Sequence, residues 1–439
     1  MESLLKTYTY ENGEIQRIHA VYADSFERLG FVRPRTTPEA IRHIASIYRD
    51  FFVARVPFLF GKLYVFYLPD GLELPFPTDG LGSRELAAVR FLKKNHRKPE
   101  GKAFLAQLEE LGCLDTVRGK NPFSVKFMPY DRIGFPSGEK GEAIINASFF
   151  MFDLFDVDSP YDVYGTPLGL CVEDGRVLCP PLFHREALLV RRDGSVTVRK
   201  AELSELDTGI PGEIYERPDR RRTPRNNKTD VVIVGDRIVA VRPGGGTRIP
   251  SSGFVISTER TDLRPGDPVV YRGMEDVLFG VQVGSSATVN GEKTLDFKVP
   301  YYHLFKPGEV QTPPSNYPKK YAKDRAPRSA IGATADGRPV LLWAEGKPKT
   351  GYEPGRDSCG ATLYEMALIA EDLGLPNCVN LDGGGSSQLL VDGVRSLLIS
   401  DRNFSDNSES ERPVPTCIVL RGASLSGVSF QAESSQQRN

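Results

Sequence analysis

The amino-acid sequence predicts a β-rich α+β fold with a mixed sheet and packed helices over residues 121–421. Two observations lead to this prediction. Asp-Gly and Gly-Asp turns recur between short alternating strands, and Gly (42) and Pro (33) are frequent among the 439 residues. One strongly amphipathic helix, residues 362–373, interrupts the strands. We expect an accessory α/β region over residues 1–120 and a disordered Ser- and Gln-rich tail over residues 422–439.

The first 120 residues combine helix and strand signals but contain no clustered polar residues that would suggest catalysis. Apolar spacing predicts helices over 37–48, 83–92 and 102–112, the first after a Thr-Pro-Glu start and the last before a stop at Gly112. Aromatic and β-branched residues predict strands over 58–60 and 63–68. We therefore expect this region to be an accessory unit of unknown role that packs on the rest.

From about residue 121 the sequence is dominated by strands. The predicted strands are 123–128, 143–146, 168–172, 176–178, 187–190, 196–199, 231–234, 238–241, 329–334 and 340–344. Asp-Gly or Gly-Asp pairs between neighbouring members indicate hairpins. This alternation predicts a core made mainly of sheets.

The densest chemical signal lies near the C-terminus. Thr362 and Glu365 have the spacing of a capping box, which predicts the start of a helix that ends at Gly374. A short apolar strand over 378–381 then leads to Asp382, three glycines and Ser386. We expect the helix to pack on the sheet that carries this strand.

An acid at the end of a strand, directly before three glycines, has two interpretations. Glycine backbone amides can form a nest that holds an anion, which would place Asp382 beside a phosphate site. The tract is otherwise a Gly-rich bend in which Asp382 only forms a turn. A Walker A loop is excluded because no Lys follows the glycines, and a nucleophile elbow because Gly-x-Ser-x-Gly is absent.

Composition limits the other function classes. Lys plus Arg (56) and Asp plus Glu (57) nearly balance, which disfavours nucleic-acid binding as the main role. The Arg-rich stretch 217–225 lies in a Pro-rich loop without interleaved aromatics, so a solvated loop is favoured there. No apolar run suits a membrane span and the N-terminal residues lack the pattern of a signal peptide, so we expect a cytoplasmic protein.

Neither the histidines nor the cysteines suggest a metal site. The five His have no HxH or HExxH spacing, and none of the six Cys forms a CxxC or CxC pair. His184 and His303 are weak candidates for proton transfer, because an isolated His is more often structural. We expect no metal, no cofactor and free thiols.

Five blocks, in order, resemble the phosphodiester glycosidase family. They are Asn146-Ala147-Ser148-Phe149-Phe150, Arg328-Ser329-Ala330-Ile331-Gly332, Gly360-Ala361-Thr362-Leu363-Tyr364-Glu365, Asn380-Leu381-Asp382-Gly383-Gly384-Gly385-Ser386 and Arg412-Pro413-Val414. The resemblance covers about residues 121–421 and none of 1–120. Ala147 departs from the family, where Gly is usual.

The resemblance implies cleavage of the bond between a sugar anomeric carbon and a phosphodiester oxygen. It implies catalytic roles for Asp382, as base, nucleophile or electrostatic stabiliser, and secondarily for Glu365, with Asp357 as a further carboxylate. The implied substrate-binding residues are Asn146, Arg328, Thr362, Gly383, Gly384, Gly385, Ser386 and Arg412. We expect the polar loop 401–411 to be a mobile lid beside the site.

The expected partner is a glycosyl-phosphate or anionic glycan substrate, with no nucleic acid and no membrane; the sequence leaves the oligomeric state open. Two alternatives remain beside a glycosyl phosphodiester hydrolase. One is an enzyme acting on another anionic glycan, and the other is a non-catalytic glycan-binding or structural module that keeps the fold. The presence of Asp382, Arg328 and Arg412 together favours an enzyme, because a binding module does not need the carboxylate.

Overall fold

The computed structural model describes most of the chain outside its N-terminal third. The described residues are 1–10, 12–34, 63–65, 74–76, 88, 91–92, 94–95, 97–110, 114–116, 134, 136–151, 159, 161–162, 165–217, 219–293, 324–348, 351–401, 408–422 and 428–432. The predicted helix 37–48 and the predicted strands 58–60 and 123–128 lie outside these residues, as does most of the predicted helix 83–92.

The largest sheet has eight strands in the order β19-β18-β22-β20-β21-β2-β1-β26. Their bounds are β1 Glu2–Thr9, β2 Ile15–Tyr22, β18 Ser286–Val289, β19 Glu292–Lys293, β20 Arg328–Ala333, β21 Pro339–Ala344, β22 Asn377–Asn380 and β26 Val428–Ala432. Only β1 and β26 pair in parallel, so the predicted mixed character rests on one pair among the described strands.

Two five-stranded sheets accompany it, in the orders β10-β9-β17-β11-β12 and β24-β23-β6-β25-β3. The first contains β9 Cys171–Glu173, β10 Arg176–Cys179, β11 Glu186–Arg191, β12 Val196–Lys200 and β17 Val277–Val281. The second contains β3 Leu29–Val32, β6 Ala143–Asn146, β23 Leu389–Val391, β24 Val394–Arg395 and β25 Cys417–Leu420.

The remaining elements are a four-stranded sheet, two short pairs and a few helices. The sheet, β13-β16-β14-β15, contains β13 Glu213–Glu216, β14 Arg225–Val234, β15 Arg237–Gly245 and β16 Gly253–Thr258. The pairs are β4 Leu63–Val65 with β5 Leu114–Thr116, and β7 Phe149–Phe150 with β8 Pro167–Leu168. The helices are α4 Pro99–Glu110 and α5 Leu363–Asp372, with 3₁₀ turns η1 Phe26–Arg28, η2 Leu203–Glu205 and η3 Gly384–Ser386. The described chain is thus mostly β.

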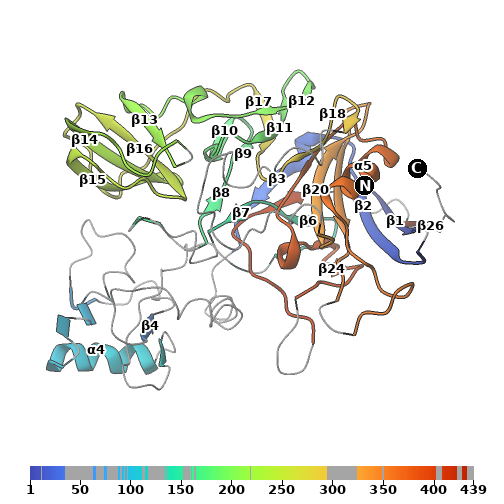
Figure 1. Ribbon diagram of the computed structural model, residues 1–439, viewed down its shortest axis with the longest axis horizontal. Helices are drawn as coiled ribbons and strands as arrows, with labels where there is room; N and C mark the ends of the chain where they lie inside the picture. The colour runs from blue at the N-terminus through green and yellow to red at the C-terminus, as the bar shows by residue number, and fades with distance from the viewer. Residues whose placement is uncertain are drawn as a thin grey trace.

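Helix α5 covers one face of the eight-stranded sheet, as predicted. Thr362 caps the helix, and the capping box with Glu365 is complete. The buried side of α5, including Met366 and Ala370, packs with Ile18 of β2 and Cys378 of β22. The helix and the strand before Asp382 therefore share one core. Figure 1 shows α5 beside β18 and β20 of the same sheet.

The opposite face of this sheet packs against both five-stranded sheets. Trp343 of β21 shares a cluster with Phe279 of β17 and Ile418 of β25. Alternate residues of β21 enter the two clusters, because successive strand side chains point to opposite faces. The four-stranded sheet packs in turn on the far face of the β9–β11–β17 sheet and lies at one end of the molecule (Figure 1).

The hairpins expected between 176 and 344 are confirmed, but the strand expected over 168–172 is divided in two. Gly169 has φ +121°, and a Cβ there would lie 2.0 Å from the carbonyl oxygen of Gln282. The Gln282 side chain accepts from the amides of Leu170 and Leu182 and donates to two carbonyls. The backbone therefore bends at Gly169 to meet this buried side chain.

The boundary expected at residue 120 does not separate the sheets. Strand β2 lies between β1 and β21 in the eight-stranded sheet, and β3 pairs with β25 in a five-stranded sheet. Residues 2–32 are therefore part of the main body, because their strands complete sheets begun by the C-terminal half. Helix α4, three residues ahead of the predicted 102–112, lies in a separate part of the N-terminal third (Figure 1).

The tail expected to be disordered also contributes to the main body. Strand β26, Val428–Ala432, pairs in parallel with β1 and forms the edge of the eight-stranded sheet. The polar composition of this segment does not predict a strand. An edge strand is held by backbone hydrogen bonds to its neighbour, and these do not require apolar side chains. The described residues contain no helix long and apolar enough to cross a membrane.

The position of β2 leads to a stability prediction. Ile18 is fully buried between α5 and the sheet, so Ile18→Ala should lower the free energy of unfolding by about 2–5 kcal/mol. The matched control is Val270→Ala, which removes a side chain that is 66% exposed and should change it by less than about 0.5 kcal/mol. Urea unfolding of both variants measures the difference, and equal effects would show that β2 is not part of the core.

Candidate functional site

Asp382 is held between the large sheet and the strand segment that follows β6. The amide of Leu381 donates to the carbonyl of Ser329 at 2.8 Å, and the amide of Asp382 donates to the carbonyl of Ala147 at 3.0 Å. Three of the sequence blocks therefore meet at this residue, although they are far apart in the chain.

Asn146 is the side chain that joins these segments. Its Nδ2 donates to the carbonyl of Asp382 at 2.7 Å, and its Oδ1 accepts from the Ser329 hydroxyl at 2.7 Å and the Gln388 amide at 3.1 Å. Asn146 has no exposed surface. These contacts position Asp382, and the contact of Asn146 with a sugar stays a prediction.

The Asp382 carboxyl group is buried among donors and positive charges. Burial raises its pKa from 3.8 to about 6, while a hydrogen bond from Ser386 and the charges of Arg412 and Arg328 oppose the rise. Only 8% of the residue is exposed. A carboxyl group with such a pKa remains mostly ionised at neutral pH but titrates close to it.

Arg412 lies between a buried acid and the serine of the glycine tract. Its Nε and Nη2 contact Asp401 Oδ2 at 3.0 and 2.8 Å, and its Nη1 donates to Ser386 Oγ at 3.4 Å. Asp401 is only 2% exposed, so this pair is shielded from water. The substrate contact predicted for Arg412 stays a prediction. An acid in the polar loop 401–411 is not a distinctive sequence signal, so the sequence does not single out Asp401 as the partner of Arg412.

Gly385 is required because this ion pair packs directly on its backbone. A Cβ at Gly385 would lie 2.1 Å from Asp401 Oδ2 and 2.3 Å from Arg412 Nη2. Gly384 has φ +63°, a left-handed conformation that favours glycine, and no atom lies within 4 Å of a Cβ placed there. The tract is therefore crowded at Gly385 and open at Gly384.

The predicted anion nest is not formed by all of the tract's amides. Gly384 donates to the carbonyl of Pro327 at 2.9 Å, and Ser386 donates to the carbonyl of Gly383 at 3.4 Å. The Gly383 amide is hydrogen-bonded to the Asp382 carboxyl group. These amides already donate to carbonyl oxygens of the chain and to the Asp382 carboxyl group. The positive charge available to an anion at the site therefore comes mainly from arginine side chains.

Arg328 is a buried cation at the start of β20. Its Nε donates to the carbonyl of Ala361 at 3.0 Å and its Nη2 to the carbonyl of Asp324 at 2.9 Å. The residue is only 2% exposed, yet its charge lowers the pKa of Asp382. Ala361 lies just before α5 and Asp324 just before β20, so Arg328 supports the fold as well as the site.

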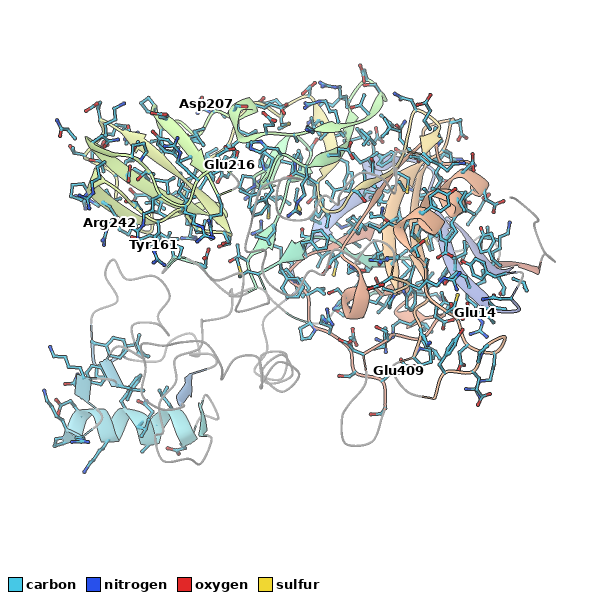
Figure 2. All side chains as sticks on the ribbon, viewed as in Figure 1. Glu14, Tyr161, Asp207, Glu216, Arg242 and Glu409 are labelled. Atoms are coloured by element: carbon cyan, nitrogen blue, oxygen red, sulfur yellow. The ribbon has the colours of Figure 1, made fainter. Side chains whose placement is uncertain are left out.

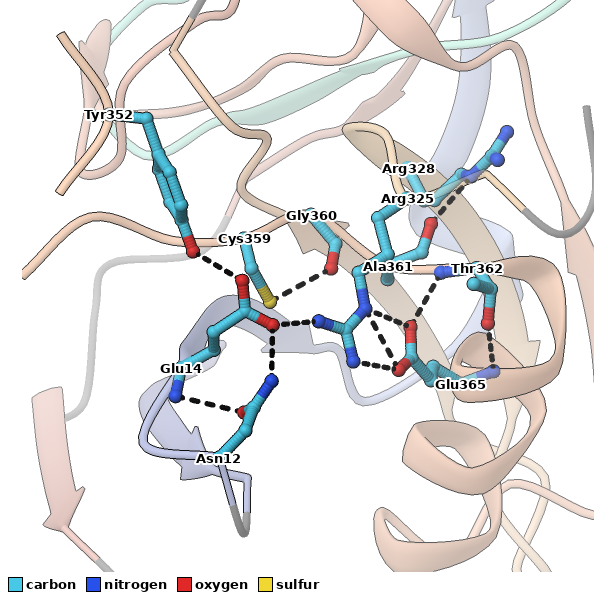
Figure 3. Close-up of polar contacts among 10 residues, drawn as sticks. All are labelled: Asn12, Glu14, Arg325, Arg328, Tyr352, Cys359, Gly360, Ala361, Thr362 and Glu365. Carbon is cyan, nitrogen blue, oxygen red and sulfur yellow. Dashed lines mark hydrogen bonds and ion pairs between the residues drawn. The ribbon is translucent and has the colours of Figure 1, made fainter. Parts of the chain in front are cut away.

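Thr362 and Glu365 belong to a neighbouring network that fixes the start of α5. Glu365 accepts from the Thr362 amide at 2.8 Å and from Arg325 Nη2 at 2.7 Å, and Arg325 Nη1 contacts Glu14 at 2.5 Å. Figure 3 shows Arg325 between the two carboxylates, with Tyr352 donating to Glu14 at 2.8 Å. Glu365 therefore has a structural role here, and its catalytic role stays a prediction.

The weaker candidates lie in other surroundings. Asp357 pairs with the exposed Arg356 at 2.9 Å, which holds the pKa of the carboxyl group below its usual range. His184 lies beside Glu202 and Asp219, at 3.4 and 3.6 Å. His303 and residues 402–407 of the predicted lid fall outside the described residues. Within the described ranges, no group of three or more His, Cys, Asp or Glu residues could hold a metal ion.

A cavity of about 540 Å³ lies at the β23–β24 hairpin. Its lining includes Arg395, Leu398, Glu409 and Glu411, with Arg395 and Glu411 paired at 3.1 Å. Glu409 marks this region in Figure 2, where Arg242 and Glu216 mark the four-stranded sheet at the other end. Asp382 is not among the residues that line this cavity.

Comparison with known proteins confirms the predicted family resemblance. Residues 227–421 match the family model described as phosphodiester glycosidase. Four of the five sequence blocks fall inside this range, and the block at Asn146 lies before it. The matched range is slightly less than half of the chain.

Curated relatives are similar over parts of their length. N-acetylglucosamine-1-phosphodiester alpha-N-acetylglucosaminidase of Homo sapiens is 26% identical over 241 residues, covering 49% of this chain and 43% of that protein. The Mus musculus protein of the same name is 27% identical over 101 residues, or 23% and 18% of the two chains. The SPbeta prophage-derived uncharacterized protein YomE of Bacillus subtilis (strain 168) is 39% identical over 75 residues, or 17% and 11%. Each match spans less than half of the relative's length.

Solved structures give more distant matches. The catalytic domain of zebrafish N-acetylglucosamine-1-phosphodiester alpha-N-acetylglucosaminidase, auto-inhibited by its pro-peptide, aligns with a TM-score of 0.41 and 12% identity, covering 96% of this chain and 82% of that one. A hypothetical protein from Synechocystis aligns with a TM-score of 0.41 and 14% identity, covering 95% and 61%.

The pKa of Asp382 leads to a prediction on stability. The folded chain holds this proton more tightly than the unfolded chain does, so stability falls as pH rises from about 4 through 6. The amide of Asp382→Asn does not titrate between pH 4 and 6. Relative to the natural protein, this variant should gain about 3 kcal/mol over this window, since one pKa unit is worth about 1.4 kcal/mol.

Denaturant unfolding at several pH values measures this difference. Asp336→Asn is the control, because the exposed Asp336 has a pKa lowered by a hydrogen bond from Thr334 and its loss should bring no such gain. A stability difference between Asp382→Asn and the natural protein that stays constant from pH 4 to 7 would contradict the burial of the charge.

Proposed function

We propose that this chain is a hydrolase that cleaves glycosyl phosphodiesters, between the sugar anomeric carbon and the phosphate oxygen. The observation that carries the proposal is the buried Asp382 carboxyl group, whose pKa the charges of Arg328 and Arg412 lower against the effect of burial. All three residues lie within the region that matches the family model. Curated relatives named for this class of bond are similar over part of the chain, which supports the reaction type. A related anionic glycan is a substrate of the same chemical class.

In the proposed reaction the positively charged arginines bind the phosphate, and the negatively charged Asp382 acts on the sugar. Arg412 meets the phosphate, because a guanidinium group presents planar pairs of donors to phosphate oxygens. Asp401 holds this guanidinium in place through Nε and Nη2, and Nη1 reaches Ser386. Arg328 adds a second positive charge that acts on Asp382.

Asp382 acts on the sugar in this proposal. The transition state of glycoside cleavage has oxocarbenium character at the anomeric carbon, which an adjacent carboxylate stabilises as nucleophile, base or fixed charge. The leaving phosphate needs little protonation, so a dedicated general acid is not required. Asn146 and Ser329 fix the backbone of Asp382 so that its position does not change during the reaction.

The first functional prediction concerns the carboxylate. Asp382→Asn preserves shape but removes charge, and should lower turnover at least about a hundredfold, equal to about 2.7 kcal/mol of transition-state stabilisation. KM should change much less, because the phosphate contacts belong to the arginines. Release of free sugar from a panel of α-glycosyl-1-phosphodiesters provides the measurement, with Asp336→Asn as the exposed control. Near-natural turnover in folded Asp382→Asn would reduce Asp382 to a turn residue.

The second concerns the phosphate contact. Arg412→Lys keeps a positive charge for Asp401 but loses the planar pair of donors, so KM should rise about tenfold, equal to about 1.4 kcal/mol, with a smaller effect on kcat. Arg395→Lys is the matched control, since Arg395 forms a similar pair with Glu411 away from Asp382. The same loss in both variants would show a structural effect and contradict the proposed role of Arg412.

A further inference from the structure

Two cysteines outside the site face each other across neighbouring strands. Cys171 of β9 lies opposite Cys179 of β10, and both are buried, at 1% and 3% exposure. The connecting turn contains Asp174 and Gly175, both with positive φ, as in the turns that close tight hairpins. The register shifts between Val177 and Cys179, so the extra residue at 178 brings Cys179 rather than Leu178 opposite Cys171.

The two sulfur atoms interact with each other and with a cation. They are hydrogen-bonded to one another, and Arg33 Nη2 lies 3.5 Å from Cys179 Sγ. The hydrogen bond from Cys171 and the charge of Arg33 lower the pKa of Cys179, against burial and the charge of Asp236. The same hydrogen bond and burial raise the pKa of Cys171. Because the Arg33 guanidinium group contacts Cys179 and not Cys171, a negative charge on the pair is favoured at the Cys179 sulfur.

Another buried cysteine shows what a thiol does without such partners. Burial raises the pKa of Cys378 to about 12, and no other cause is resolved for it. Such a thiol is inert, because the thiolate is the reactive species. Reactivity in this chain is thus expected at Cys179, where a thiol partner and a guanidinium group meet.

We propose that Cys171 and Cys179 form a thiol–disulfide modification site that reacts with small-molecule disulfides such as glutathione disulfide. The Cys179 thiolate attacks one sulfur of the disulfide, forms a mixed disulfide and releases one glutathione thiolate. Cys171 then transfers its proton to that thiolate and attacks the Cys179 sulfur, releasing the second glutathione as its thiolate. The two protein thiols are oxidised to one disulfide and glutathione disulfide is reduced to two glutathiones. The site does not depend on the function proposed above.

Redox titration of the folded full-length protein tests this site. The protein is equilibrated with mixtures of reduced and oxidised glutathione, trapped by alkylation in acid denaturant and mapped by peptide mass spectrometry. We expect an internal disulfide between residues 171 and 179, with Cys359, Cys378 and Cys417 still alkylated as free thiols, and full reversal by dithiothreitol. Free thiols at both positions under fully oxidising buffer would overturn the proposal, as would a disulfide that links either of them mainly to another cysteine.

Variants separate the roles of the two sulfurs. Cys171→Ser should stop the reaction at a mixed disulfide of Cys179 with glutathione, and Cys179→Ser should react at least about tenfold more slowly at Cys171, because the thiolate is lost. Cys359→Ser is the matched control and should form the internal disulfide as the natural protein does. Equal rates at Cys171 and Cys179 in the two single variants would contradict the assigned asymmetry. The natural protein alone decides the proposal if a variant does not fold.

Discussion

The arrangement of the site depends on one buried amide side chain. Asn146 ends β6 in one sheet, accepts a hydrogen bond from the hydroxyl group of Ser329 of β20 in another, and donates a hydrogen bond to the backbone carbonyl of Asp382. A buried polar group without partners is costly, so each partner of Asn146 must be in place when the sheets pack. This requirement couples the packing of two sheets to the position of the carboxyl group that we propose to be catalytic.

The second constraint is electrostatic. Asp382, Asp401 and Arg328 are buried, and the Arg412 side chain is 13% exposed, so each of these charges depends on the others for compensation. Burial raises the pKa of Asp382 although two cations lie near it, which means that loss of water outweighs their attraction. In the function that we propose, these positive charges meet an anionic ligand.

The third constraint is closure of the core by the first 32 residues. Strand β2 pairs with β21. Glu14, directly before β2, accepts a hydrogen bond from Arg325, which also contacts Glu365 at the start of α5. The Glu365 carboxylate thereby links the start of the helix to Arg325. The same contacts explain why the N-terminal strands cannot be separated from the region that carries the site, although no site residue comes from them.

The local features of this protein could be predicted from its amino-acid sequence. They are the Thr362–Glu365 capping box, the Asp-Gly hairpins, the strand that leads to Asp382 and the family resemblance, and each depends on residues close together in the chain or on an ordered set of motifs. The tertiary structure was needed to show that β1, β2 and β26 complete the large sheet, since strand pairing over hundreds of residues leaves no local signal. It likewise decided that Asn146 positions a backbone, that Asp401 holds Arg412, and that Gly385 is glycine because an ion pair packs on it. Those roles depend on which atoms meet in space, and spacing along the chain does not specify that.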